Sequence, residues 1–169
     1  MNSMIESKAV LLGNNIDTDQ IYPGRFLALV EPSEVGKHCL EGLDEETRRL
    51  APGSILVAGT NFGCGSSREH AVITLQNAKV QAVVAESFAR IFFRNAINLG
   101  LPLITCKGIS QAVKTGQTLR VDLEAGSVTV LETGAVLPAE KLGDHILKII
   151  HAGGIKPLFR ARYAKEGLE

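Results

Sequence analysis

The sequence has no excess of either charge and no long hydrophobic run. Its 18 lysine and arginine residues balance 18 aspartate and glutamate residues, so no long-range attraction to nucleic acid or to an anionic membrane is expected. No apolar stretch approaches the roughly 18 residues of a membrane-spanning helix. Residues 1–6 lack the charged and apolar regions of a signal peptide. We therefore expect a cytoplasmic protein with no nucleic-acid or membrane partner.

The cysteine and histidine residues predict no metal site on this chain. The three cysteines are odd in number and far apart, which matches neither a disulfide framework nor a CxxC motif. The four histidines form no HxxxH or HExxH pattern. Only His70 lies within a motif, where it either orients Glu69 or has a functional role.

The length and the order of the predicted elements indicate one α/β domain. A chain of 169 residues, 45% of them hydrophobic, suffices for one core and is short for two, so residues 1–169 are expected to form one domain. After a first strand at residues 9–12, apolar runs alternate with helical patterns, which predicts parallel strands with right-handed crossovers. The predicted strands are 54–58, 82–85 and 102–105, and the predicted helices between them are 67–77 and 88–98.

The C-terminal third has a different pattern. Residues 119–123 and 128–131 alternate apolar and polar side chains, which predicts an antiparallel hairpin with one solvated face. A last helix is expected at about 140–152, ending before a glycine pair, and peripheral helical segments are expected at 34–40 and 42–49. The predicted fold is a central, mostly parallel sheet flanked by helices, with a C-terminal antiparallel hairpin.

Residues 59–71 (GTNFGCGSSREHA) carry the strongest functional signal. They join a predicted buried strand to a predicted helix, where free backbone N–H groups and the helix dipole favour an anion. Ser66 and Glu69 have the spacing of a capping box, so a purely structural turn remains an alternative. Arg68 opposes the dipole preference for acidic residues at a helix start, and an anionic ligand such as a carboxylate explains it better.

Two other segments are candidates for the site. Residues 16–25 are polar at their start, are broken by Pro-Gly and follow a turn signal at 13–15, as expected of a functional loop. Residues 86–100 read as a helix capped by Ser87, with Phe88, Ile91, Phe92 and Asn95 on one face and Arg90, Arg94 and Asn98 on a neighbouring face. Aromatic residues at this spacing usually pack in a core, and the arginines and Asn95 are left open as a partner or site surface.

Several common motifs are excluded by spacing. The run from Gly63 to Arg68 begins like GxGxxG but ends in arginine, and no GKS or GKT follows a glycine-rich loop, so a nucleotide is not favoured. The GxSxG elbow of serine hydrolases also fails, because Arg68 stands two residues after Ser66.

Taken together, these motifs resemble the small-subunit family of 3-isopropylmalate dehydratase, which contains the swivelling β/β/α domain of the aconitase superfamily. The resemblance is carried in family order by residues 15–27, 59–71, 85–92 and 95–96. It implies a hydro-lyase subunit that isomerises 2-isopropylmalate to 3-isopropylmalate in leucine biosynthesis. It also implies a heterodimer that is active only with an iron-sulfur large subunit, whose [4Fe-4S] cluster binds the small hydroxy-dicarboxylate substrate.

The resemblance also assigns site residues. Ser66 matches the serine whose alkoxide removes the proton next to a carboxylate, and Asp19 matches an active-site acid. The substrate carboxylate is expected at Gly65, Ser67 and Arg68, and Arg25 is a further substrate-binding candidate, whose entry into the pocket would count against an apolar substituent. Leu27, Ala28 and Leu29 match the loop that reads the variable substituent. Their apolar character favours isopropyl over an extra carboxylate, whose unpaired burial would be costly.

Other functions remain open from the sequence. A related hydro-lyase subunit, for homoaconitate, citramalate or 2,3-dimethylmalate chemistry, is compatible with the same motifs. A module that binds a small dicarboxylate without a partner is an alternative from a different class.

Overall fold

One sheet of seven strands organises the chain, for which the computed structural model describes residues 3–166. The first two residues of the polar N-terminal stretch lie outside the described part. The strand order is β4-β3-β2-β1-β5-β6-β7, and the first four of these strands are parallel. They are β1 (Met4–Leu11), β2 (Ile55–Ala58), β3 (Ala82–Ala85) and β4 (Leu103–Thr105).

The C-terminal strands form an antiparallel meander on the other side of β1. They are β5 (Thr118–Asp122), β6 (Ser127–Val130) and β7 (Ala135–Pro138). The predicted hairpin is confirmed, and β7 extends it by one strand that the sequence did not reveal. β1 joins the two halves because Ala9 to Leu11 pair with β2 while Met4 to Lys8 pair with β5. The first strand therefore begins at Met4, five residues before the start that the sequence predicts.

Burial explains the two strand patterns. Every residue of β2 and β3 is completely buried, which is why these strands show no alternation. In β5, Leu119 and Val121 are completely buried whereas Arg120 between them is exposed. The sheet also curls, since the chain after β7 returns to β4, where the Glu140 N–H donates to the Thr105 carbonyl over 2.9 Å.

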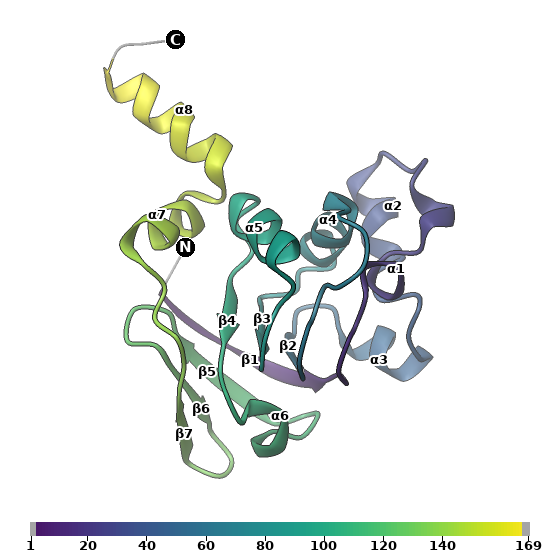
Figure 1. The fold of residues 1–169 in the computed structure, drawn as a ribbon, viewed down its shortest axis with the longest axis vertical. Coiled ribbons are helices and arrows are strands. Elements are labelled where there is room, and N and C mark those ends of the chain that lie inside the picture. Colours follow the sequence, from purple (N-terminus) through teal and green to yellow (C-terminus); the bar gives the residue numbers. More distant parts are fainter. Residues whose placement is uncertain (1–2, 167–169) are drawn as a thin grey trace.

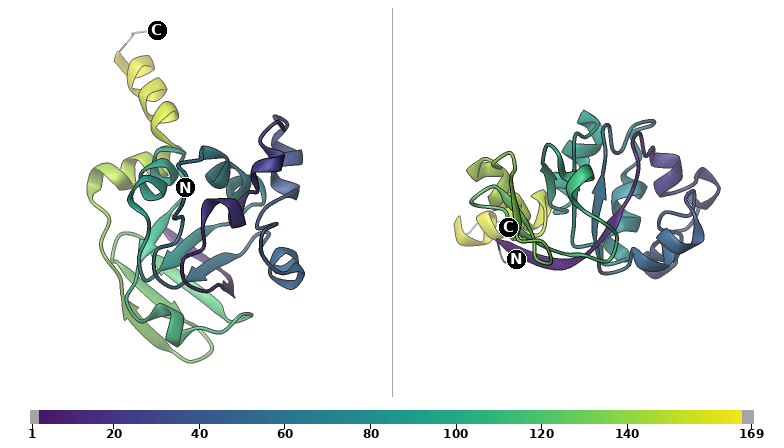
Figure 2. Two further views of the ribbon diagram at one scale, coloured as in Figure 1. Left: turned by 45° about the vertical axis from the view of Figure 1, so that its right-hand side comes forward. Right: turned by 90° about the horizontal axis from the view of Figure 1, so that it is seen from below.

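Helices pack beside one another along the sheet (Figure 1). α4 (Glu69–Asn77) lies between α2 (Pro32–Lys37) and α5 (Arg90–Asn98), and α5 in turn contacts α7 (Asp144–Ala152). Figure 1 and the left view of Figure 2 show α8 (Ile155–Glu166) leaving the body of the molecule. The shorter helices are α1 (Thr18–Ile21), the 3-10 helix η1 (Gly24–Phe26), α3 (Glu45–Leu50) and α6 (Ile109–Ala112).

Two helix predictions need correction. α5 begins at Arg90 and Ser87 does not cap it, because the Ser87 hydroxyl oxygen instead accepts a hydrogen bond from the Asn61 N–H at 2.8 Å. Ile91, expected on the face with Phe92, is 56% exposed. α8 was not predicted as a separate helix.

None of the helices within residues 3–166 has the length and apolar character needed to cross a bilayer.

Candidate active site

The strongest candidate site lies where the parallel strands end. Short bridges extend the sheet beyond β1, β2 and β3, pairing Asp17 with Cys64 and Phe62 with Phe88. These bridges bring the segments after three strands side by side. In parallel α/β sheets this carboxyl edge is the usual place for a ligand.

Glycine is required at Gly63 by both conformation and packing. Its φ of 86° lies in the left-handed region, and its N–H donates to the Ile16 carbonyl at 2.7 Å. A Cβ atom at this position would lie 2.6 Å from the Cβ of Phe92. The absent side chain therefore lets α5 pack directly against the turn between β2 and α4, here called the serine turn (residues 59–68).

Ser66 lies on the exposed side of the serine turn. Its Oγ is 3.3 Å from the hydroxyl oxygen of Thr18, a residue that is 2% exposed. The predicted capping box is wrong, because α4 has Arg68 at its N-cap position and no side chain caps the helix. Ser66 stands two residues too early for that role. Its hydroxyl is instead available to solvent and to a ligand.

Arg68 and Asp19 form an ion pair that joins two of the predicted motifs. Arg68 Nη1 donates to Asp19 Oδ1 at 3.0 Å, and the Gly24 N–H donates to the same oxygen at 3.0 Å. These hydrogen bonds, first that from Gly24 and then that from Arg68, hold the pKa of Asp19 below its usual value of 3.8. The guanidinium also lies over Gly24, 3.4 Å from where a Cβ would stand.

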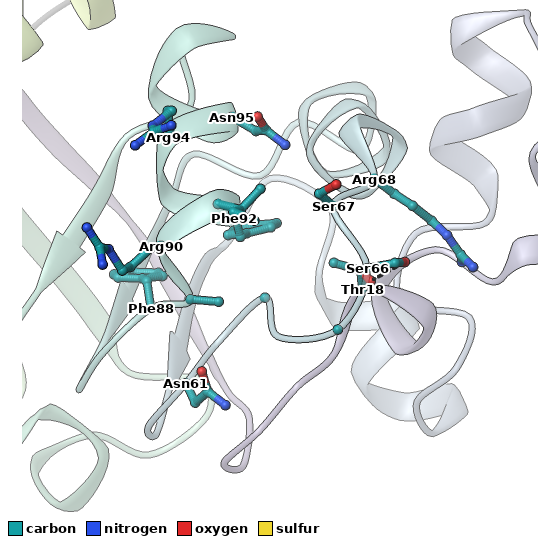
Figure 3. Close-up of a pocket in the computed structure, with 14 residues that line it drawn as sticks. Thr18, Asn61, Ser66, Ser67, Arg68, Phe88, Arg90, Phe92, Arg94 and Asn95 are labelled. Atoms are coloured by element: carbon teal, nitrogen blue, oxygen red, sulfur yellow. Dashed lines mark hydrogen bonds between the residues drawn. The ribbon is translucent and has the colours of Figure 1, made fainter.

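An open pocket of about 570 Å³ separates the serine turn from the first two turns of α5 (Figure 3). Its lining contains three guanidinium groups and no carboxylate. The sequence left Arg90, Arg94 and Asn95 open as a partner or site surface, and the structure places them in the lining of this pocket. The lining comprises Thr18, Asn61, Gly63, Gly65, Ser66, Ser67, Arg68, Phe88, Ala89, Arg90, Ile91, Phe92, Arg94 and Asn95.

The sequence did not assign Thr18 or Asn61 to the site. The only signal for Thr18 was its position in the polar loop before Asp19, and Asn61 gave none beyond membership of the serine turn. Asn61 has a positive φ of 60°, and its N–H is held by Ser87. Long-range contacts of this kind are not visible in local patterns.

The other predicted substrate residues lie outside the pocket lining. Arg25 has a 66% exposed side chain, stacks over Phe26 at 4.6 Å from the ring centroid and approaches Glu41 at 3.9 Å. Leu27 is 39% exposed, Ala28 is exposed and Leu29 is half-buried. This loop follows Gly24, on which Arg68 rests, so it borders the site from the Asp19 side.

The histidine and cysteine residues are dispersed. His70 stacks on Tyr22 with ring centroids 5.8 Å apart. Cys39 and Cys106 are buried, and Cys64 is partly exposed in the serine turn. Within the described part of the chain, no three His, Cys, Asp or Glu side chains come together as a metal-binding group.

Comparison with known proteins identifies close relatives. Residues 43–107 match the aconitase C-terminal domain family. The chain is 48% identical over 166 residues to the isopropylmalate/citramalate isomerase small subunit of Methanocaldococcus jannaschii, with 98% of this chain and 99% of the relative covered. It is 49% identical over 161 residues to 3-isopropylmalate dehydratase small subunit 1 of Methanopyrus kandleri, with 95% of each covered.

A solved structure with the same family name is similar to this chain along almost its whole length. The crystal structure of 3-isopropylmalate dehydratase from Methanocaldococcus jannaschii matches with a TM-score of 0.90 and 36% identity, over 97% of this chain and 98% of that one.

Proposed function

Because this chain belongs to the family of 3-isopropylmalate dehydratase small subunits, we propose that it isomerises 2-isopropylmalate to 3-isopropylmalate together with a large subunit. The observation that carries the proposal is the identity of 48% to a named small subunit along almost the whole of both chains. The serine turn adds a chemical reason, since it presents Ser66, Ser67 and Arg68 to one pocket.

Ser66 is proposed as the base that takes the proton next to a substrate carboxylate. A serine hydroxyl is a weak base, so its anion needs hydrogen-bond donors and positive charge nearby. Thr18 stands 3.3 Å away, and the uncapped start of α4 adds the positive end of its dipole. When the proton moves to the Ser66 alkoxide, the C–H electron pair forms the double bond and the substrate hydroxyl leaves as hydroxide with the C–O electron pair. Hydroxide then adds to the carbon that lost the proton, and Ser66 Oγ returns its proton to the carbon that carried the hydroxyl.

Arg68 is proposed to hold the carboxylate beside the reacting carbon. Negative charge builds on that carboxylate as the proton leaves, and a guanidinium binds it with two parallel hydrogen bonds. Asp19 accepts one Arg68 N–H and leaves the others for the substrate. Asp19 therefore orients Arg68, and the Ser67 hydroxyl and the Gly65 backbone complete the carboxylate site.

The iron-sulfur cluster is expected on the large subunit. The described residues of this chain offer no cluster of metal ligands, so the chain's contribution is the base and the carboxylate site. When bound in the partner, the cluster supplies Lewis-acid polarisation of the leaving hydroxyl. The small-subunit designation of the relatives supports the partnership.

The substrate is proposed to have an apolar substituent. Leu27, Ala28 and Leu29 offer no charge to a third carboxylate, and Arg25 is turned towards Glu41. The name of the Methanocaldococcus jannaschii relative includes citramalate, whose methyl substituent is also apolar, so citramalate is the second candidate. Both substrates suit the same loop.

Anaerobic reconstitution with the cognate large subunit tests the proposal. The complex should isomerise 2-isopropylmalate, act next best on citramalate and neglect homocitrate, whereas neither subunit alone should turn over substrate. Preferential turnover of homocitrate would contradict the role given to the loop. Tight calorimetric binding of 2-isopropylmalate by this chain alone, with no turnover by the complex, would support a stand-alone binding module instead.

A further inference from the structure

The pocket wall opposite the serine turn carries Arg90 and Arg94, which form no ion pair within the described part of the chain and which also line a second pocket together with Glu140. Arg90 and Arg94 are four residues apart on α5, so they share a face of the helix, and both are exposed. Asn95 lines the pocket beside the serine turn. Within residues 3–166, no carboxylate lies within salt-bridge distance of either guanidinium, and none lines that pocket.

Within residues 3–166, the arginines fall into those with an ion pair and those without one, and Arg49, Arg160 and Arg162 resemble Arg90 and Arg94 in having none but do not line this pocket. Four arginines approach an acidic side chain to between 3.0 and 3.9 Å, namely Arg25, Arg48, Arg68 and Arg120. Arg90 differs further because it occupies the first position of α5, where the helix dipole disfavours a cation. Stability of the helix therefore does not explain Arg90, and an anion in the pocket would offset the charge of both arginines.

Figure 3 shows how the two walls face each other. Ser66, Ser67 and Thr18 lie on one side, Arg90 and Arg94 lie on the other, and the Phe92 ring stands between them. Arg68 adds a guanidinium on the side of the serines, so the pocket has positive charge on both sides of an aromatic surface, which suits a short hydrocarbon chain with a carboxylate at each end. One guanidinium alone would not distinguish a dicarboxylate from a monocarboxylate.

We propose that Arg90 and Arg94, with Asn95, bind the second carboxylate of the substrate while Arg68 holds the first. The inference rests on the proposed function and identifies where this chain selects dicarboxylates. Arg90 and Arg94 are positioning and specificity residues, whereas proton removal stays with Ser66.

Paired charge-changing variants and substrate analogues test this assignment in the reconstituted complex. Arg90→Gln and Arg94→Gln keep much of the side-chain size and remove the charge, and Arg160→Gln on α8 is the control because Arg160 is exposed and does not line the pocket. Competitive inhibition constants are measured for 2-isopropylmalate analogues in which either carboxylate is replaced by an amide. Turnover of 2-isopropylmalate gives KM and kcat separately.

The expected result is a rise in KM of roughly tenfold or more for each variant, as for a lost hydrogen bond to a charged group, with a smaller change in kcat. The double variant should bind one monoamide as well as the dicarboxylate, while Arg68→Gln should lose discrimination against the other monoamide. Arg160→Gln should behave as wild type. Arg90→Lys should restore part of the selectivity.

Unchanged KM and unchanged monoamide discrimination would overturn the assignment. If the same variants instead weaken binding to the large subunit in sedimentation experiments, the arginines belong to the subunit interface and the proposal is also refuted. A wild-type complex that fails to isomerise 2-isopropylmalate would refute the proposed function itself, which this readout separates from the role of the arginines. Circular dichroism melts establish that each variant is folded.

Discussion

Replacing Gly63 by alanine tests how α5 is held against the serine turn. Two costs add at this position. A left-handed φ of 86° costs an L-residue about 1–2 kcal/mol. The new Cβ would lie 2.6 Å from the Cβ of Phe92, and overpacking of this kind typically costs about 1–3 kcal/mol. The expected loss in free energy of unfolding is about 2–5 kcal/mol.

A matched variant separates these two costs. Gly116 also has a positive φ, 96°, but a Cβ there would meet no atom within 4 Å. Gly116→Ala should therefore lose only the backbone part, about 1–2 kcal/mol. Both variants gain equally from the smaller entropy of the unfolded chain, so that effect cancels in the comparison.

Urea denaturation and thermal melting provide the measurement. At roughly 2–4 °C per kcal/mol for a chain of this size, Gly63→Ala should melt about 4–20 °C below wild type. If Gly63→Ala and Gly116→Ala lose the same stability, the close packing of Phe92 on the serine turn is wrong. The pocket wall built on that contact would then be wrong as well.

Two further predictions concern a carboxyl group and a buried hydroxyl. Asp19 contributes stability above its usual pKa of 3.8, and this is lost as pH falls through its lowered folded-state pKa. NMR titration should place the pKa of Asp19 below 3.8. Arg68→Gln should raise this pKa only part of the way to 3.8, because the hydrogen bond from the Gly24 N–H remains. A pKa of 3.8 in that variant would contradict the role given to Gly24. Thr74→Val removes the buried hydrogen bond to the Val35 carbonyl, which keeps only the His38 N–H as a donor, and should cost about 0.5–1.5 kcal/mol in urea denaturation. Thr74→Ser should lose less, and equal losses would contradict the hydrogen bond.

The parallel half of the fold was predictable because its signals are local. The strands at 55–58 and 82–85 are continuous apolar runs, and each is completely buried. The family predicted from the sequence motifs is confirmed by the relatives. Those motifs also placed Asp19 and Arg68 in one site, and the structure brings them into contact at 3.0 Å.

The missed elements lacked a buried face. β7 is an edge strand with a 64% exposed Val136 and a final proline, which edge strands tolerate, so it does not alternate like the hairpin. α8 projects from the body with Phe159 and Tyr163 exposed, so it has no amphipathic signature. Its separation from α7 depends on the glycine pair at 153–154, a pattern that predicts the end of a helix but not the start of another.

The missed parts of the site depend on long-range contacts. Ser66 and Glu69 had the spacing of a capping box, yet the helix starts after Arg68 and Ser66 approaches Thr18 instead. The place of α5 across the pocket results from the pairing of Phe62 with Phe88. Neither contact has a periodicity that a single sequence displays.

Hydrogen exchange at the substrate carbon next to the carboxylate tests the central claim about Ser66 most directly. The reconstituted complex is incubated with 2-isopropylmalate in D2O, and deuterium incorporation is followed by mass spectrometry for wild type, Ser66→Ala and the control Ser33→Ala, an exposed serine on α2. Wild type and Ser33→Ala should exchange at the same rate, and Ser66→Ala should be slower by roughly 10²–10⁴-fold, as expected for loss of a general base, while it still binds the large subunit. Exchange by Ser66→Ala at the wild-type rate would contradict the account.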